Sequence, residues 1–252
     1  LSSIGLYYLG IIGLVNFKHS LLVRKVVSMG ALYLIAIFIW GNIFVPQDRL
    51  LKVTFLDVGQ GDSIFIQFPD KKNMLIDGGD GRFDILPSYL WDEGIRRIDY
   101  LVLTHPHADH VTGLINVLSS FKVGEVWDSG QKFPSPEYEK FLRIIDDKRI
   151  PYKIVRAGER LSIAPGIGID ILHPQEKFLK GGGSEPNNNS IVIRLFYKRV
   201  AFLFTGDIEK EAEEFLERKY GTQLHSTILK VPHQGSRTSS TLKFLEKVSP
   251  EC

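Results

Sequence analysis

The sequence has almost no cysteine: of its 252 residues only the last, Cys252, carries a thiol. A disulfide within the chain is therefore excluded, and so is a metal site built from several thiolates. Acidic residues are absent from residues 1–45, which contain three basic residues. Residues 46–252 hold all 29 acidic residues beside 28 of the 31 Lys and Arg, a net charge of −1. This balance excludes a globally basic nucleic-acid binder, so any affinity for a polyanion must come from a local site.

Two uncharged apolar stretches, 1–17 and 26–45, open the chain. A helix that spans a bilayer core needs about 20 apolar residues, so we predict two transmembrane helices in a first domain, 1–45. The alternatives are a signal peptide or a buried helical hairpin. The three basic residues lie between the stretches, and short basic loops stay cytoplasmic. Residues 46–252 are therefore expected outside the cell, in a multi-pass membrane protein.

Both ends of the sequence predict a fragment of a longer protein. The chain starts inside an apolar run and stops just after Ser-Pro-Glu. We therefore expect the second domain, 46–252, to be truncated at its C-terminal end.

Strand-like and helix-like runs alternate through residues 46–252 and predict layered α/β packing. Runs rich in Val, Ile, Leu and Phe predict strands at 51–57, 62–68, 73–77, 100–104, 123–127, 152–155, 167–172, 190–197, 200–205 and 227–231. Apolar residues at helical spacing predict helices at 83–94, 109–120, 137–148, 208–219 and 239–247. By composition, the Gly- and Asn-rich segment 180–190 is a flexible loop.

The residues with the clearest chemistry are His105, His107, Asp109 and His110, directly after the strand predicted at 100–104. Three of the seven histidines of the chain lie in this six-residue run. Imidazole and carboxylate are ligands for Zn, Mn or Fe ions. His105 and His107 can point the same way from an extended turn and suit one ion. Asp109 and His110 begin the next helix and can face a second ion.

Two later strand ends supply further ligand types. Asp207 ends the apolar run 202–207, and a carboxylate at such a point can bridge two ions about 3.5–4 Å apart. His233 ends the run 229–233. Each residue alone is weak evidence for a metal site, because a strand-end Asp is often a helix cap and a lone His is often structural. In this order after the first motif, they predict a two-ion hydrolase site.

These residues resemble the metallo-β-lactamase superfamily, and more narrowly the soluble hydrolase domain of ComEC-type DNA-uptake channel proteins. The segments that carry the resemblance are 55–63, 75–79, 104–110, 188–194, 204–207 and 230–236. The fold that it implies is an α/β αββα sandwich, with two mixed sheets and outer helices. The two predicted membrane helices match the end of that family's channel portion.

The resemblance also implies roles for single residues, around two divalent ions, Zn or Mn. His105 and His107 would bind the first ion; Asp109, His110 and His233 would bind the second; Asp207 would bridge them. Asp207 and Asp109 would act in catalysis, with Lys230, Ser236 and a water on an ion left open as general acid. Supporting residues around the ligands would be Asp57, Gln60, Asp62, Asp77, Asn188, Asn189 and Ser236. For the first three of these, a tight Gly-rich turn is an equal alternative.

The chain departs from the superfamily pattern in two places. Many members place a further His on the first ion, where this chain reads Pro186-Asn-Asn-Asn-Ser190. The ComEC-like branch shares this pattern, and water, Asn188 or Asn189 could complete the site, whereas His173 is read as structural. The family commonly has paired histidines where this chain has His233-Gln234.

The function that the resemblance implies is DNA degradation by a phosphodiesterase domain of a DNA-uptake channel in natural transformation. Its partners would be DNA (single-stranded, or the strand that is not transported), the membrane, the upstream channel and other DNA-uptake components. Two alternatives remain open: a phosphodiesterase for small esters such as phosphocholine esters, and a non-catalytic domain that guides DNA.

Overall fold

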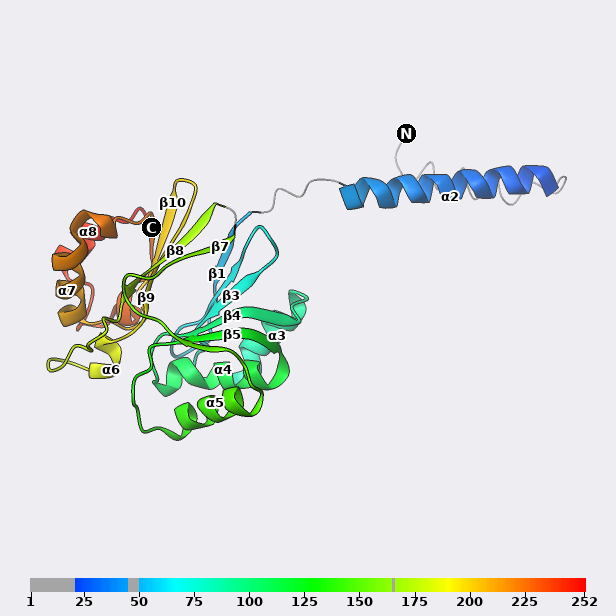
Figure 1. Cartoon of the computed structure of the whole chain (residues 1–252). Coiled ribbons are helices and arrows are strands. Elements are labelled where there is room, and N and C mark those ends of the chain that lie inside the picture. The colour runs from blue at the N-terminus through cyan, green and yellow to red at the C-terminus, as the bar shows by residue number, and fades with distance from the viewer. Residues whose placement is uncertain (1–20, 45–49, 165) are drawn as a thin grey trace. The chain divides into compact units, whose positions relative to one another are not determined.

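The computed structural model describes residues 21–44, 50–164 and 166–252. The chain divides into two compact units, Leu1–Asp48 and Arg49–Cys252. In the first unit, the described residues form one helix, α2 (Leu21–Phe44), drawn in blue in Figure 1.

Helix α2 exposes large apolar side chains along its length, among them Leu32, Leu34 and Ile35. It covers most of the second predicted membrane span, 26–45, while the first, 1–17, lies outside the described residues. None of the helices in the described part of the chain is long and apolar enough to cross a membrane. Membrane attachment of this chain therefore stays a prediction.

Among its described residues the second unit contains two mixed sheets. In sheet A the strands follow chain order, with β1, β2 and β3 antiparallel and β3 to β6 parallel. Its strands are β1 (Lys52–Phe55), β2 (Ile64–Gln67), β3 (Asn73–Ile76), β4 (Arg97–Leu103), β5 (Lys122–Asp128) and β6 (Tyr152–Ile154).

Sheet B has the order β11-β10-β9-β8-β7 and is antiparallel except for the pair β10 and β11. Its strands are β7 (Arg160–Ala164), β8 (Ile167–His173), β9 (Val192–Tyr197), β10 (Val200–Phe204) and β11 (Ile228–Leu229). Strand β7 has no counterpart among the predicted strands.

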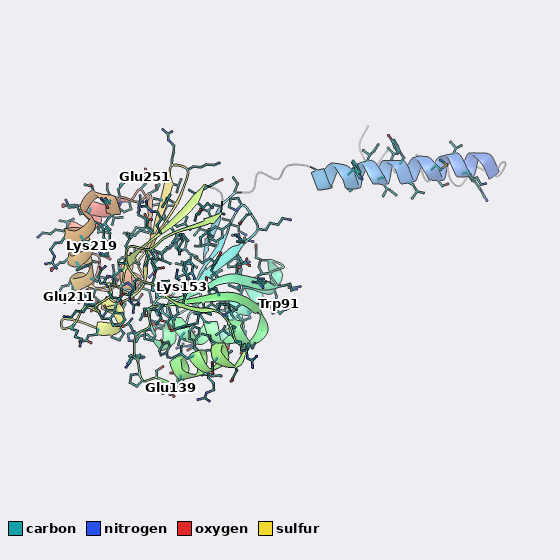
Figure 2. The ribbon with its side chains drawn as sticks, viewed as in Figure 1. Trp91, Glu139, Lys153, Glu211, Lys219 and Glu251 are labelled. Atoms are coloured by element: carbon teal, nitrogen blue, oxygen red, sulfur yellow. The ribbon has the colours of Figure 1, made fainter. Side chains whose placement is uncertain are left out.

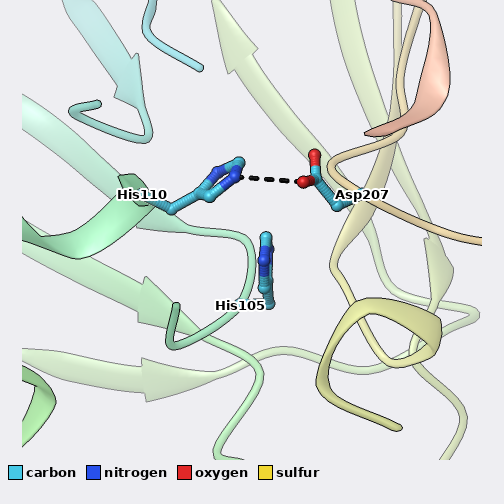
Figure 3. A group of neighbouring side chains, drawn as sticks. All are labelled: His105, His110 and Asp207. Atoms are coloured by element: carbon cyan, nitrogen blue, oxygen red, sulfur yellow. Dashed lines mark hydrogen bonds and ion pairs between the residues drawn. The ribbon is translucent and has the colours of Figure 1, made fainter. Parts of the chain in front are cut away.

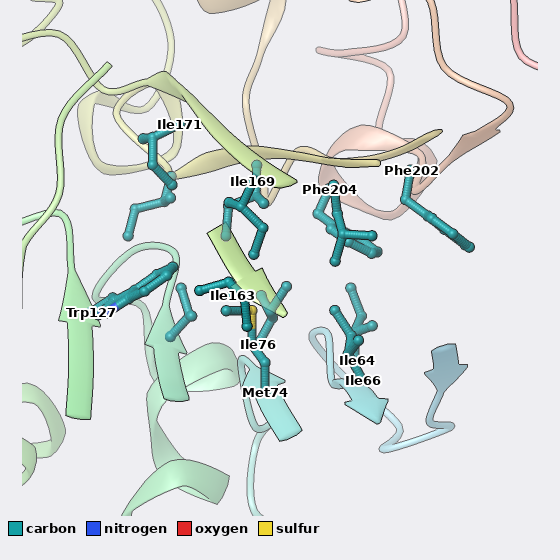
Figure 4. Packing of buried hydrophobic residues seen from close by; sticks show 14 of the residues in the cluster. Ile64, Ile66, Met74, Ile76, Trp127, Ile163, Ile169, Ile171, Phe202 and Phe204 are labelled. Carbon is teal, nitrogen blue, oxygen red and sulfur yellow. The ribbon is translucent and has the colours of Figure 1, made fainter. Parts of the chain in front are cut away.

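The two sheets pack face to face through a core of buried aliphatic and aromatic side chains (Figure 4). Alternate residues point inwards, because successive side chains of a strand face opposite sides of its sheet. Sheet A contributes Ile64, Ile66, Met74, Ile76 and Trp127, and sheet B contributes Ile163, Ile169, Ile171, Phe202 and Phe204.

Helices cover the outer face of each sheet (Figure 1). Sheet A carries α3 (Ile85–Asp92), α4 (Ala108–Ser120) and α5 (Pro136–Asp147), and sheet B carries α7 (Lys210–Tyr220) and α8 (Leu242–Val248). Exposed charged side chains such as Glu139 and Lys219 lie on these helices (Figure 2). Short 3-10 turns, which do not affect the layers, are η1 (Arg82–Asp84), η2 (Gly221–Leu224) and η3 (Pro232–Gly235). The predicted αββα layering of the second unit is confirmed.

The prediction of a flexible loop over 180–190 is wrong for its second half. Residues Glu185–Asn188 form a short helix, α6, and Asn187, Asn188, Asn189 and Ser190 are all buried. Composition predicted a loop because Asn and Gly are poor helix formers. Here the buried amides have hydrogen-bonding partners in the surrounding chain, which holds the segment in place.

Candidate metal centre

The chemically distinctive residues gather at one edge of the sandwich, where strands of both sheets end. Strands β3 and β4 are parallel neighbours in sheet A, and β10 and β11 are parallel neighbours in sheet B. The carboxyl ends of parallel strands meet at one edge of a sheet. Residues that directly follow these strands are therefore brought together although up to 153 positions, from Asp77 to Lys230, separate them in the chain.

Three of the predicted ligands form a buried cluster at this edge (Figure 3). His105 and His110 are 0% exposed and Asp207 is 3% exposed. The potential ligand atoms of the three all lie within 4.8 Å of one another. Nε2 of His110 points at Asp207 and lies 3.2 Å from its Oδ2. Two buried imidazoles beside a buried carboxylate make a donor set suited to a divalent transition metal.

Asp77 lies behind this cluster and orients it. Its Oδ2 lies 2.9 Å from Nδ1 of His110, so the other ring nitrogen, Nε2, is left facing Asp207. The carboxylate also accepts hydrogen bonds from the backbone N–H and the hydroxyl of Thr104, at 2.8 and 2.7 Å. Asp77 has a positive φ of 56°, a conformation that few residues other than Gly, Asn and Asp adopt. A carboxylate of this kind fixes the tautomer and direction of a metal-binding imidazole.

His107 and His233 stand on either side of the buried cluster. Nδ1 of His107 lies 3.1 Å from Nε2 of His105. Two nitrogen ligands of one tetrahedral zinc lie about 3.3 Å apart, given Zn–N bonds of about 2.0–2.1 Å. On the other side, Nε2 of His233 lies 3.8 Å from Oδ2 of Asp207. The ring nitrogens of these histidines and the carboxylate of Asp207 thus make a donor set that fits a divalent metal.

Asp109 lies at the rim of the centre and is partly exposed. Its Oδ2 accepts a hydrogen bond of 3.4 Å from the side-chain amide of Gln60. The loop after β1 thus contacts the start of α4, and a supporting role for Gln60 in the site stays a prediction.

Lys230 brings a buried positive charge to the centre. Its Nζ forms an ion pair with Asp62, lies 3.6 Å from Oδ1 of Asp207, and donates to the carbonyl of Gly206 at 3.1 Å. Only 9% of the side chain is exposed. Burial raises the pKa of the Asp62 carboxyl, and the attraction of Lys230 counters that rise.

Close backbone packing of the two sheets places Asp207. The N–H of Ile191 donates to the carbonyl of Thr104 at 3.0 Å, and the N–H of Asp207 donates to Oγ of Ser190 at 3.3 Å. Gly206 has φ 54°, and a Cβ there would lie 2.9 Å from Cβ of Ser190 and 3.1 Å from Cβ of Thr104. Position 206, directly before Asp207, therefore requires glycine, because a side chain there would clash with Ser190 and Thr104.

Residues 56–252 match the metallo-β-lactamase superfamily, which is more than half of the chain. The chain belongs to this superfamily. The fold agrees: the metallo-β-lactamase SMB-1 bound to 2-mercaptoethanesulfonate superposes with a TM-score of 0.51, at 13% identity over 78% of this chain and 89% of that one. A hydrolase fold of this superfamily together with the buried His/Asp cluster implies binding of divalent metal.

Within the superfamily, the sequence is similar to competence proteins, as the motifs predicted. It is 32% identical to competence protein ComA of Neisseria gonorrhoeae over 210 residues, which is 82% of this chain and 27% of that protein. It is 26% identical to ComE operon protein 3 of Bacillus subtilis over 219 residues, 79% of this chain and 27% of that protein. The chain thus spans about a quarter of the length of these relatives.

In this metallo-β-lactamase fold, the amide side chains of Asn188 and Asn189 form hydrogen bonds with the backbone of neighbouring segments. Oδ1 of Asn188 accepts from the N–H groups of Glu209 and Ala212, which caps the start of α7. Asn189 exchanges hydrogen bonds with the backbone of Leu179, at 2.8 and 3.0 Å. The idea that either amide completes the first metal site is therefore corrected, because both side chains are engaged elsewhere.

Three further predictions have mixed outcomes. Asp57 is exposed, and its Oδ1 accepts from the N–H of Gly59 at 3.2 Å, so its visible role is a turn in its own loop. Oγ of Ser236 lies 3.1 Å from Oγ1 of Thr238, beside His233 rather than in the buried cluster. His173 is fully buried with Nε2 2.9 Å from the carbonyl of Asn188, in keeping with the structural role expected for it.

Sequence reasoning missed Thr104, Ser190, Glu209 and Thr238, all of which contact predicted site residues. Thr104 directly precedes the His-rich run, and its hydroxyl lies 3.1 Å from Nδ1 of His105. Adjacency to a ligand was the one signal that could have indicated it. Ser190 and Thr238 lie close in sequence to the predicted site residues Asn189 and Ser236, but only the tertiary contacts reveal which groups their hydroxyls meet.

The histidines of the centre differ in protonation when no metal is bound. Burial and the charge of His110 hold the pKa of His105 well below its ordinary value, and burial lowers the pKa of His107. Burial alone would lower the pKa of His110 as well, but Asp77 and Asp207 outweigh it and hold that pKa well above the ordinary value. At neutral pH the metal-free centre therefore contains an imidazolium at His110 beside the neutral rings of His105 and His107.

Metal binding is therefore expected to release about one proton from His110 near pH 7. An ion needs the bare Nε2 of a neutral imidazole, so it must displace a proton that Asp77 and Asp207 stabilise. Since the pKa of His110 is raised, metal affinity should rise with pH until that pKa is passed. Calorimetric titration with Zn²⁺ in buffers of different ionisation enthalpy counts the protons. Binding heats that do not depend on the buffer would contradict the prediction.

Proposed function

We propose that this chain is a metal-dependent phosphodiesterase that degrades DNA during DNA uptake. Two of its relatives over about four fifths of the chain are competence protein ComA and ComE operon protein 3, and this similarity carries the choice of substrate. The superfamily fold and the buried His/Asp cluster support hydrolysis assisted by metal ions.

The proposed centre would hold two divalent ions, Zn²⁺ or Mn²⁺, which would lower the pKa of a bound water and neutralise charge on the phosphate. His105 and His107 would hold one ion, and His110, His233 and Asp109 the other. Asp207 would bridge them. The first group has fewer protein ligands, so we propose that its ion is the more weakly bound.

The chain's own residues would prepare the phosphodiester for cleavage. Asp77 holds the ring of His110 in one orientation through the 2.9 Å contact with its Nδ1. Lys230 presents an ammonium beside Asp207, where it can stabilise negative charge on the phosphate or donate a proton to the leaving oxygen. Asp109, at the rim, would orient the nucleophile.

We also propose that the chain is attached to the cell membrane, as part of a channel protein with other DNA-uptake components as partners. The exposed apolar side chains of α2 and the apolar composition of residues 1–17 support this. The basic residues between the two apolar stretches favour a cytoplasmic loop there. The hydrolase domain would then lie outside the cytoplasm and act on the strand that is not transported.

The purified chain, kept in detergent and supplied with Mn²⁺ or Zn²⁺, is expected to degrade end-labelled DNA. Changing Asp109 to Ala should lower the rate about 100-fold or more, because a group that orients the nucleophile typically contributes that much. The matched control is Asp147→Ala, which removes an exposed carboxylate from α5. Fragment lengths over time, read on denaturing gels for single- and double-stranded DNA, give the rates.

Two results would overturn this function. Intact DNA together with rapid cleavage of bis(p-nitrophenyl) phosphate would indicate an esterase for small phosphodiesters. Intact DNA together with DNA binding and no retained metal would indicate a non-catalytic guide for DNA.

A further inference from the structure

A buried carboxylate with no part in the proposed ligand set lies behind His233. It belongs to Glu209, in the segment between β10 and α7, and the residue is 5% exposed. Its Oε1 lies 3.5 Å from Nδ1 of His233. Its other oxygen, Oε2, accepts from the N–H of Ser184 at 2.8 Å, which anchors the carboxylate from the opposite side.

A threonine hydroxyl connects this carboxylate to the ring. Oγ1 of Thr238 donates to Oε1 of Glu209 at 3.1 Å and lies 3.3 Å from Nδ1 of His233. A hydroxyl has a single proton, so once it donates to the carboxylate it can only accept from the ring. In the neutral ring, Nδ1 of His233 then carries the hydrogen, and Nε2, the nitrogen that faces Asp207, is bare.

A hydroxyl that donates to a carboxylate also lies beside Nδ1 of a second histidine, His105. Oγ1 of Thr104 donates to Oδ2 of Asp77 at 2.7 Å and lies 3.1 Å from Nδ1 of His105. His105 belongs to the buried ligand cluster and comes from sheet A. His233 follows β11 of sheet B. Two histidines from different sheets therefore each have a hydroxyl and a carboxylate behind Nδ1.

The backbone at His233 shows why such support is needed. This residue has φ 48° and ψ 41°, in the left-handed region that non-glycine residues rarely occupy. Strain of this kind persists only when the surroundings hold it. The N–H of Lys210 donates to the carbonyl of Thr238 at 3.0 Å, which joins the start of α7 to the loop that carries His233.

We propose that Glu209, acting through Thr238, is the positioning residue for His233 as a metal ligand. Together they fix the Nδ1–H tautomer and the direction of the ring. The inference rests on the proposed function in one respect, that His233 binds metal. Partners of this kind typically contribute 10–100-fold to metal affinity.

The tautomer can be read in the metal-free chain, without any activity. In the ¹⁵N-histidine-labelled protein, long-range ¹H–¹⁵N spectra at a pH where His233 is neutral should show a protonated Nδ1 and a bare Nε2. The His233→Gln variant identifies its signals. Thr238→Val, which keeps the shape and removes the hydroxyl, should give a mixture of tautomers. Thr238→Ser, which keeps the hydroxyl, should restore the single form.

Zinc affinity supplies the second measurement, by competition with a chromophoric chelator. Glu209→Gln and Thr238→Val should weaken Zn²⁺ binding 10–100-fold at the more affected site. Thr238→Ser should stay within about twofold of the parent, since the donor to Glu209 is retained. The control Glu214→Gln removes an exposed carboxylate of α7, the helix that follows Glu209, and should also stay within about twofold of the parent.

An unchanged tautomer and unchanged zinc affinity in both Glu209→Gln and Thr238→Val would overturn the proposal, and Glu209 would then only anchor the chain at Ser184. If Glu209→Gln fails to fold, the comparison of Thr238→Val with Thr238→Ser tests the proposal by itself. The parent chain could show a single tautomer, and the variants weaker zinc binding, while the parent leaves DNA intact. That result would contradict the nuclease function and support the positioning role.

Discussion

Changing Asp207 to Asn is expected to abolish hydrolysis, with a rate at least about 1,000-fold below that of the parent chain. Asn has nearly the same shape but lacks the negative charge that pairs with His110 at 3.2 Å and faces Lys230 at 3.6 Å. Burial would raise the pKa of Asp207, but the hydrogen bond and charge of His110 outweigh it and lower that pKa. The carboxylate is therefore ionised at any pH at which the protein works, and its charge is the part that Asn removes.

The same substitution should release metal. Bound Zn²⁺ or Mn²⁺ per chain, measured by elemental analysis after dialysis, should fall in Asp207→Asn and stay unchanged in the control Asp147→Asn, whose carboxylate is exposed on α5. Circular dichroism shows whether the variant is folded. A folded Asp207→Asn chain that keeps both its metal and its rate would remove Asp207 from the centre.

Changing Gly113 to Ala is expected to have the largest effect on stability. A Cβ at this position of α4 would lie 1.8 Å from the carbonyl oxygen of Gly78 and 2.6 Å from its carbonyl carbon. The helix and the turn after β3 are joined by two hydrogen bonds, from the N–H of Gly78 to the carbonyl of His110 at 2.9 Å and from the N–H of Gly113 to the carbonyl of Gly79 at 3.1 Å. The methyl group must push α4 away from this turn and break both.

The expected loss is about 3–5 kcal/mol, the range of severe core changes. In a domain of this size this lowers the melting temperature by roughly 6–20 °C. Thermal unfolding of the metal-free chain measures it, with Ser120→Ala as control, since that residue is exposed at the end of the same helix. Because α4 carries His110 and the turn follows Asp77, the 2.9 Å contact between those residues should also be lost. A melting temperature within about 2 °C of the parent would contradict the packing described.

Local sequence patterns predicted helices and strands well where the apolar residues recur at the spacing of the element and are buried in the structure. The helix predicted at 109–120 is α4, Ala108–Ser120, and the strand predicted at 200–205 is β10, Val200–Phe204. Strand β7, Arg160–Ala164, was missed because its polar residues at 160 and 162 weaken the apolar signal, and pairing with β8 supplies the stability instead.

Prediction of the centre depended on how far apart its residues are in the chain. The short run from His105 to His110 was evident because its ligand types lie side by side in the sequence. The amides of Asn188 and Asn189 were left open as metal ligands, beside water, because their type allowed it. Only the fold shows that Asn188 caps α7 and that Asn189 binds a neighbouring loop. An amide serves a metal, a helix end or a loop equally well, so its neighbours decide its role.

The sequence by itself determined which chemistry this chain can carry: imidazoles and carboxylates at strand ends, one late cysteine, and an apolar N-terminal part. The tertiary structure decided which of these groups meet. Parallel strands of two sheets end at one edge, and this brings Asp207 within 3.2 Å of His110, 97 residues away in the chain. It also placed a threonine and a carboxylate behind His105 and again behind His233. The contacts with the carboxylates of Asp77, Glu209 and Asp207 join segments distant in sequence. No local pattern records them, because a hydrogen bond depends on separation in space.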